Sequence, residues 1–136
     1  MTPDELLAVA RDSASQAVIP YSRFPVGAAV ETRDGRVFGG CNIESASYGL
    51  TICAERVAIF SAKAAGADPI AIAVSCTRGN PSEPSSLTPC GACRQIMMDQ
   101  MGPDAPCYID GVGAFTVDDL LPLGFRLPPA ISTFPQ

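Results

Sequence analysis

At the start of the chain, apolar positions follow first a helical and then a strand-like period. The opening segment Thr2-Pro3-Asp4-Glu5 is typical of a helix start, with Thr as the cap, Pro in the first turn and Glu closing a capping box. Apolar side chains then recur at helical spacing, so we expect this helix to end near Val18. Strand-like runs at residues 26–32 and 36–42 flank a turn signal at residues 33–35, which predicts a hairpin.

The rest of the chain alternates helical patterns with short apolar strands. Stretches of helix formers without breakers predict two more helices, at residues 51–65 with Gly66 as the C-cap and from residue 88 to about 102. Residues 69–76 are apolar throughout, as expected for a buried inner strand. The remaining elements are a loop rich in Ser and Pro at 78–87, strands at 107–110 and 114–117, and a helical turn at 118–121.

This order of elements predicts an α/β fold. Helices separate the later strands, which favours a single mixed β-sheet of about five strands covered by helices. A chain of 136 residues is long enough for one domain with its own core and too short for two ordinary ones. We therefore expect residues 1–136 to form a single domain.

Composition narrows the classes of function. Charged residues make up 17% of the chain, below the roughly 25% of an average domain, so we expect a large core or contacts between copies of the chain. The formal net charge of −5 disfavours nucleic acid as a partner, because binding to phosphates needs clustered Lys and Arg. The chain has no histidine, which excludes histidine-based catalysis and metal sites built from imidazole.

The six cysteines could form disulfides or serve as metal ligands. The acidic N-terminus lacks the apolar core of a signal peptide, and the longest apolar run, residues 70–74, is far shorter than the ~20 residues of a membrane span. We therefore expect no membrane association and a cytoplasmic location, where clustered cysteines are more often ligands or catalytic than cross-linked. Two groups are expected to fill the core rather than bind a ligand, the strand cysteines Cys41, Cys76 and Cys107 and the methionines Met97, Met98 and Met101.

The other three cysteines stand at the predicted starts of two helices. Cys90 and Cys93 are separated by two residues, so on a helix they face one side and can hold one zinc ion. Cys53 belongs to the preceding helix and would reach the same ion through the fold. Helix N-termini favour deprotonated thiols, and three ligands leave the fourth zinc position open, as in catalytic rather than structural sites. The expected cofactor is one Zn²⁺ per chain.

Charged side chains beside these cysteines complete the candidate site. Glu55 follows Cys53 by two positions, so it need not bind the metal and can act as a proton carrier beside it. Arg56 and Arg94 could donate hydrogen bonds to the sulfurs and withdraw the excess negative charge of three thiolates. Simpler interpretations stay open, with Arg94 as a solvated charge and the two later cysteines as a redox pair or half of a structural zinc site.

At these residues the sequence resembles the zinc-dependent cytidine deaminases, in particular their short, homotetrameric branch with cysteine-only zinc ligands. The similar segments cover most of the chain: residues 21–29, 40–56, 89–95 and 120–125. The resemblance implies a three-layer α/β/α fold and the hydrolytic deamination of cytidine and 2′-deoxycytidine to the uridine counterparts with release of ammonia, a reaction of pyrimidine salvage. A loop longer than usual at residues 78–87 and a Pro-rich tail at residues 127–136 depart from the family pattern.

The resemblance also implies a role for each site residue. Zinc would be held by Cys53, Cys90 and Cys93, with Glu55 as the proton shuttle. The substrate-binding residues would be Asn42 and Glu44 for the ribose hydroxyls, Phe24 for the pocket wall, the Ala54 N–H for the pyrimidine carbonyl, the Thr88 carbonyl for the 4-amino group, and Phe125 for stacking on the base in a neighbouring subunit's site. The assembly would then be a homotetramer with shared active sites. Without the resemblance, Phe125 would be interpreted as an ordinary core residue.

Two alternative functions stay open. One is deamination of another aminopyrimidine nucleoside, such as a nucleoside antibiotic, although residues 42–48 favour an ordinary ribose. The other is a structural zinc module that binds a protein partner, which would need a fourth ligand that the spacing does not supply and would leave Glu55 without a role. The expected partner is therefore a small nucleoside.

Overall fold

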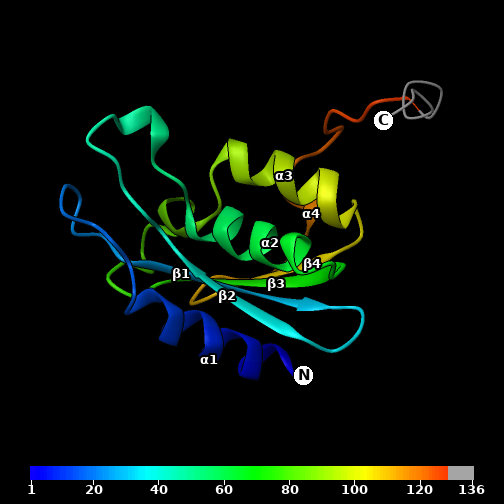
Figure 1. Cartoon of the computed structure of the whole chain (residues 1–136), viewed down its shortest axis with the longest axis horizontal. Helices are drawn as coiled ribbons and strands as arrows, with labels where there is room; N and C mark the ends of the chain where they lie inside the picture. The colour runs from blue at the N-terminus through cyan, green and yellow to red at the C-terminus, as the bar shows by residue number, and fades with distance from the viewer. Residues whose placement is uncertain (129–136) are drawn as a thin grey trace.

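A single mixed sheet crosses the middle of the molecule (Figure 1). The computed structural model describes residues 1–128, so residues 129–136, most of the Pro-rich tail, lie outside the described part. The strand order is β2 (Val37–Cys41), β1 (Val26–Thr32), β3 (Pro69–Cys76), β4 (Pro106–Ile109), β5 (Gly113–Thr116). Neighbouring strands are antiparallel except for β3 and β4, which are parallel. The predicted mixed sheet of five strands is confirmed.

Helices cover both faces of this sheet (Figure 1). Helix α1 (Pro3–Ala14) lies against β1 and β3 on one face, and α2 (Ala54–Ala64) and α3 (Gly91–Met101) lie on the other. Helix α3 forms the crossover between the parallel strands β3 and β4, as parallel pairing requires. The three-layer α/β/α arrangement is confirmed.

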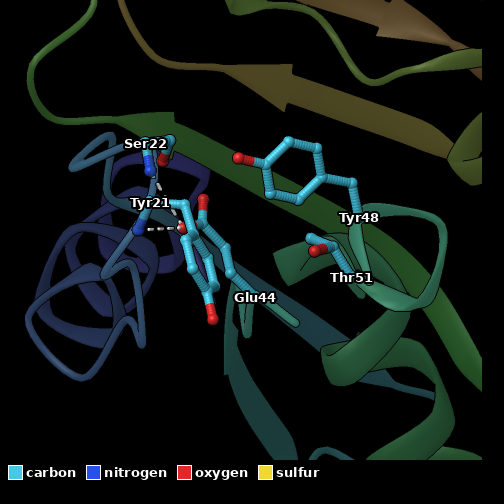
Figure 2. Close-up of a pocket in the computed structure, with 5 residues that line it drawn as sticks. All are labelled: Tyr21, Ser22, Glu44, Tyr48 and Thr51. Atoms are coloured by element: carbon cyan, nitrogen blue, oxygen red, sulfur yellow. Dashed lines mark hydrogen bonds between the residues drawn. The ribbon is translucent and has the colours of Figure 1, made fainter. Parts of the chain in front are cut away.

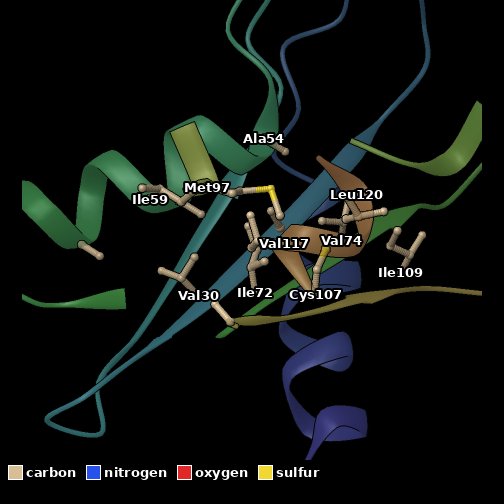
Figure 3. Packing of buried hydrophobic residues seen from close by; sticks show 14 of the residues in the cluster. Val30, Ala54, Ile59, Ile72, Val74, Met97, Cys107, Ile109, Val117 and Leu120 are labelled. Carbon is tan, nitrogen blue, oxygen red and sulfur yellow. The ribbon is translucent and has the colours of Figure 1, made fainter. Parts of the chain in front are cut away.

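Strand alternation sorts side chains by size between the two faces. The larger side chains of β1 and β3 pack with α2 and α3 in the main core (Figure 3), which includes Val30, Ile72, Val74, Ile59 and Met97. Small side chains fill the α1 side, where Ala29, Ala71 and Ala73 pack with Leu6 and Ala10. The alanines let α1 lie close to the sheet, while the bulkier face supports the two helices that carry the cysteines.

Helix α1 begins as predicted and ends earlier. The Thr2 hydroxyl accepts from the Glu5 N–H at 3.2 Å, and the Glu5 carboxylate accepts from the Thr2 N–H at 2.8 Å, which completes the predicted capping box. The prediction that the helix continues to Val18 is wrong, because it ends at Ala14. Val18 instead forms a parallel bridge with Ile43, and this long-range pairing overrides the helical spacing.

The other boundaries shift by a few residues for similar reasons. The predicted start of α2 at residue 51 is wrong because Ile52 forms an antiparallel bridge with Ile43 and Cys53 becomes the N-cap. Helix α3 has Cys90 as its N-cap and begins at Gly91 rather than at residue 88. A short helix α4 (Val117–Leu120) follows β5. The loops contain two 3₁₀ turns, η1 (Tyr48–Leu50) and η2 (Pro84–Leu87).

The expectations for sulfur-containing side chains largely hold. Met97 and Met98 are buried, and Met101 packs partly buried against the same core. Cys107 is buried, whereas Cys41 and Cys76 are only half-buried. All six cysteines lie in the described part of the chain, and the structure shows them as free thiols. Over residues 1–128, no helix is both long and apolar enough to cross a membrane.

Candidate metal centre and active site

Helices α2 and α3 place three thiols together at their N-termini. Cys53 is the N-cap of α2, Cys90 is the N-cap of α3, and Cys93 lies in the first turn of α3. The three sulfur atoms all lie within 4.8 Å of one another, and the Sγ atoms of Cys53 and Cys90 are 3.8 Å apart. Two sulfurs bound to one tetrahedral zinc at ~2.3 Å would be about 3.8 Å apart. The Cys53–Cys90 distance therefore matches a zinc site, and Cys93 lies close enough to be the third ligand.

Hydrogen bonds within the group favour a thiolate. A hydrogen bond from Cys93 and the nearby Arg56 guanidinium lower the pKa of the Cys53 thiol well below its usual range. The same sulfur–sulfur hydrogen bond, together with burial, raises the pKa of the Cys93 thiol, which acts as the donor. Because metals bind thiolates, a preformed thiolate at Cys53 prepares the group for a cation.

Glu55 is the one buried carboxylate next to the thiols among the described residues, with a relative exposure of 4%. It lies in the first turn of α2, and burial raises the pKa of its carboxyl to about 7. It lines a cavity of about 180 Å³ together with Cys53, Cys90 and Ala54, which we call the metal-side cavity. A carboxyl with a pKa near neutrality, facing a cavity beside a metal site, suits proton transfer to and from a bound molecule.

The two arginines differ in their contacts. Arg56 Nη2 donates to the Cys53 sulfur at 3.5 Å, as expected. Its Nε is buried without a hydrogen-bond partner among the described residues. Among the described residues, Arg94 donates no hydrogen bond to a sulfur, contrary to the prediction. Its guanidinium donates instead to the carbonyls of Pro89 and Leu120 and to the Thr88 hydroxyl, because its side chain extends toward α4.

Four predicted substrate-binding residues also line the metal-side cavity: Phe24, Asn42, Ala54 and Thr88. The Asn42 side chain accepts from the Val26 N–H at 3.0 Å and donates to the Phe24 carbonyl at 2.8 Å. It thereby fixes the backbone that carries Phe24 at the cavity wall. These two hydrogen bonds of Asn42 could not be predicted from its place after β2, because both partners lie far away in the sequence.

Glu44 lines a neighbouring cavity of about 370 Å³, which we call the tyrosine cavity (Figure 2). One carboxylate oxygen of Glu44 accepts from the backbone N–H groups of Tyr21 and Ser22, both at 3.1 Å. Hydrogen bonds with Ser22 and the Tyr21 N–H lower the pKa of this carboxyl. Thr51 lines both cavities, so they adjoin. Glu44 is thus close to the site but separate from Glu55.

Several lining residues were not predicted from the sequence as part of a site. Tyr21 and Tyr48 both line the tyrosine cavity, and their rings contact each other edge to face with centroids 5.7 Å apart. Cys76, expected only as a core residue, and Ser86, in the long loop, line the metal-side cavity. The loop reaches the cavity because its η2 turn leads directly into Thr88. A loop longer than usual was the only available hint.

Phe125 lies outside both cavities. Its side chain is 67% exposed, so its interpretation as a core residue is wrong. The Phe125 carbonyl accepts a hydrogen bond from the Gln95 side chain at 3.0 Å, which holds the C-terminal segment against α3. Within its own chain, Phe125 therefore faces outward.

The site and the fold together indicate a class of protein, the zinc-dependent hydrolases with an α/β/α fold. The features that indicate it are the three thiols at helix N-termini, the buried carboxylate beside them and the mixed sheet between helical layers. The family model "Cytidine and deoxycytidylate deaminase zinc-binding region" matches residues 1–107, a span that includes all three thiols and Glu55. The chain belongs to this family. The resemblance noted in the sequence is confirmed.

Relatives and solved structures agree with this assignment. A cytidine deaminase of Halalkalibacterium halodurans is 46% identical over 114 residues, covering 80% of this chain and 83% of the relative. A crystal structure of a cytidine deaminase from Burkholderia pseudomallei superposes with a TM-score of 0.81 at 44% identity, covering 92% of this chain and all of that one. A blasticidin-S deaminase of Bacillus cereus is 31% identical over 107 residues, covering 74% of this chain and 76% of the relative.

Proposed function

We propose that this protein is a zinc-dependent cytidine deaminase that converts cytidine and 2′-deoxycytidine, with water, to the uridine counterparts and ammonia. The observation that carries the proposal is the placement of Glu55 and the three-thiol group at one small cavity. The names of the relatives that cover most of the chain support it.

Glu55 carries the protons of the reaction. When bound by the three thiols, Zn²⁺ would lower the pKa of a coordinated water from 15.7 to about 7. Glu55 takes a proton from the attacking water and delivers it to N3 of the pyrimidine, then takes the second proton from the new hydroxyl on C4 and delivers it to the amino group, which leaves as ammonia. Burial raises the pKa of this carboxyl above its usual range, which favours its service as a proton donor as well as an acceptor.

Other residues in the site bind and orient the nucleoside. The Ala54 N–H donates to the pyrimidine carbonyl and the Thr88 carbonyl accepts from the 4-amino group, since both residues line the metal-side cavity. Phe24 forms the wall of this cavity, and Asn42, braced against β1, bonds to the ribose. Glu44 in the adjoining cavity bonds to a ribose hydroxyl with its second carboxylate oxygen.

Arg56 moderates the charge of the metal site. Three thiolates and one Zn²⁺ carry a net negative charge, which weakens the metal as an electrophile. The hydrogen bond from Arg56 to the Cys53 sulfur withdraws part of that charge.

The functional unit is a homotetramer of single-domain chains, residues 1–136, with shared active sites. Phe125 is exposed in its own chain, and the neighbouring Leu123 and Leu127 are also exposed. An exposed apolar series of this kind is suited to contact with a second copy, where Phe125 stacks on the base held by the neighbour. The enzyme acts in the cytoplasm in pyrimidine salvage, on free nucleosides.

The two alternatives receive less support. The first alternative, deamination of a nucleoside antibiotic, is supported by a blasticidin-S deaminase that is 31% identical to this chain. A cytidine deaminase is more similar, at 46% identity. In a structural zinc module, a fourth ligand would close the site, but the metal-ligand group found within residues 1–128 contains only the three cysteines.

The substitution Glu55→Gln tests the proposal. Glutamine keeps the shape of the side chain and cannot accept a proton, so turnover of cytidine should fall by roughly a hundredfold to ten-thousandfold. Bound zinc, measured by metal analysis, should stay at one equivalent per chain. Deamination by the variant at a rate near that of the original enzyme, or faster turnover of an antibiotic nucleoside than of cytidine by the original enzyme, would refute it.

A further inference from the structure

Helix α3 does more than position two of the three zinc-binding thiols. The residues directly after Cys93 are Arg94 and Gln95, and both donate hydrogen bonds to backbone carbonyls of the C-terminal part of the chain. Arg94 Nη1 donates to the Leu120 carbonyl at 2.6 Å, and Gln95 Nε2 donates to the Phe125 carbonyl at 3.0 Å. One helical turn therefore contacts both the metal site and the segment that carries Phe125.

The Arg94 guanidinium joins the two regions in a single group. Besides the Leu120 carbonyl, it donates to the Pro89 carbonyl at 2.8 Å and to the Thr88 hydroxyl at 3.0 Å. Thr88 and Pro89 directly precede Cys90. A planar guanidinium with donors on three nitrogens is the side chain best able to serve three acceptors in fixed directions.

The chain between these two contacts is itself stiff. A turn follows α4, in which the Gly124 N–H donates to the Leu121 carbonyl at 3.1 Å. Pro122 is the second residue and Leu123 the third, with φ +52°, as in a type II turn. A leucine in this left-handed conformation is strained, and it is fully exposed at 101% of its reference area. The turn thus leaves an apolar side chain fully exposed two residues before Phe125.

The Gln95 side chain is itself held in place. The same amide nitrogen that donates to the Phe125 carbonyl donates to the Asp99 carboxylate at 2.9 Å, one turn further along α3. Both amide hydrogens are therefore used, and the side chain has one orientation. Phe125 is positioned through its backbone, which leaves its ring free to face outward.

We propose that Arg94 and Gln95 are positioning residues that tie the C-terminal segment, residues 121–128, to the metal-ligand turn of α3, so that Phe125 is presented to a neighbouring subunit at a set distance from the metal site. This inference rests on the proposed role of Phe125 in a shared site. Arg94 acts on both the substrate-binding Thr88 loop and the C-terminal segment, and Gln95 acts on the C-terminal segment alone.

Gln95→Glu is the sharper test, because glutamate keeps the length of the side chain and cannot donate to the Phe125 carbonyl. We expect the KM for cytidine to rise about three- to tenfold, which corresponds to the free energy of one hydrogen bond, while kcat and zinc content stay nearly unchanged. Gln100→Glu is the matched control, because it adds the same charge to the same helix. Gln100 lines the same surface cavity as Phe125, but it forms no hydrogen bond with the described part of the C-terminal segment. Its KM should not change.

A double-mutant cycle shows whether Gln95 acts through Phe125. In a Phe125→Ala background, Gln95→Glu should have no further effect on KM, because the ring that it positions is gone. An equal rise of KM in both backgrounds would overturn the inference. Arg94→Lys, which cannot serve three acceptors at once, should impair both KM and kcat while zinc is retained.

A readout independent of catalysis separates this inference from the proposed function. Trypsin cleaves after Arg126, and release of the segment from Gln95 should speed that cleavage several-fold in Gln95→Glu but not in Gln100→Glu. The proposed function fails if the original protein does not deaminate cytidine, and the shared site fails if Phe125→Ala is fully active. In either case the cleavage rate still shows whether Gln95 holds the C-terminal segment against α3. Unchanged cleavage in Gln95→Glu and Arg94→Lys would refute this inference.

Discussion

Helix α1 on one face of the sheet and helices α2 and α3 on the other begin in different ways. Thr2 caps α1 with a complete capping box, and Thr116 does the same for α4. The N-caps of α2 and α3 are Cys53 and Cys90, and neither forms a side-chain capping hydrogen bond within the described structure. In α1 and α4 the N-cap residue stabilises the helix, whereas in α2 and α3 the N-cap residue is a cysteine that belongs to the three-thiol group.

This difference shows how one fold separates stability from chemistry. A capping side chain contributes about 1 kcal/mol to its helix. The α1 face retains that contribution and has no cavity-lining thiol in the described residues. Helices α2 and α3 give it up, although α4 on the same face keeps its cap, and in return they provide two helix N-termini whose positive ends favour thiolates and bound anions. A metal ion held by the three thiols would join the two helix starts to each other.

The largest expected effect comes from removing a ligand on the α3 side. Cys90→Ala leaves two thiols, so metal analysis should show loss of zinc and activity on cytidine should disappear. The melting temperature should fall as well, because the metal no longer joins α2 and α3. Cys41→Ala, a half-buried thiol outside the group, is the control and should keep zinc and activity. A Cys90→Ala protein with one full equivalent of zinc would contradict the three-thiol site.

A pair of glycines tests the two faces directly. A Cβ at Gly27 would overlap the Ala10 carbonyl in α1, and a Cβ at Gly40 would lie 2.6 Å from the Ala54 carbonyl in α2. Gly27→Ala and Gly40→Ala should each destabilise the fold by about 1–3 kcal/mol, measured by denaturant unfolding, because backbone must move. Only Gly40→Ala displaces the helix start that carries Cys53 and Glu55.

The two glycine variants should therefore separate in activity. At a temperature where both are folded, kcat/KM of Gly40→Ala should fall well below that of Gly27→Ala. Equal activity at equal stability would mean that the two faces are not functionally distinct.

A smaller effect is expected at the α1 cap. Thr2→Ala removes the hydroxyl that accepts from the Glu5 N–H and should lower the free energy of unfolding by about 1 kcal/mol. Activity and zinc content should match those of the original protein, since α1 lies on the opposite face. Thr2→Ser keeps the hydroxyl and should restore most of the stability; a loss of activity in Thr2→Ala alone would show that α1 influences the site.

The smallest effect is a pH dependence on the α1 face. Asp110 accepts from Arg11 in α1 and from Ser75, and the hydrogen bond from Arg11 lowers the pKa of this carboxyl. A lowered native pKa gives stability above the unfolded value of about 3.9, and this stability is lost as pH falls through the native value. Because Arg11 is half exposed, the contribution is about 0.5–1 kcal/mol.

Acid unfolding measures this contribution. Between pH 7 and about pH 3, Asp110→Asn should lose less stability than the original protein, because it lacks the group that titrates. Parallel curves for the two proteins would show that the ion pair makes no net contribution to folding.

Much of the candidate site could be predicted because its chemistry lies in short segments. A Cys-x-x-Cys pair on one helix start and Cys53 two positions before Glu55 are recognisable from residue types and spacing. The partners of Arg94 could not be predicted in the same way. Its acceptor Leu120 lies in α4, far along the chain, and no local pattern indicates which carbonyl a long side chain will reach.

The sequence by itself determined the types of the elements, the mixed sheet and the composition of the metal group, because periodicity and ligand chemistry act over a few residues. Only the tertiary structure decided where α1 ends, that Glu44 occupies its own cavity and that Phe125 faces outward. Each of these depends on contacts between segments far apart in the chain. The free energy of such contacts exceeds the small local preferences, so they override the pattern wherever the two conflict.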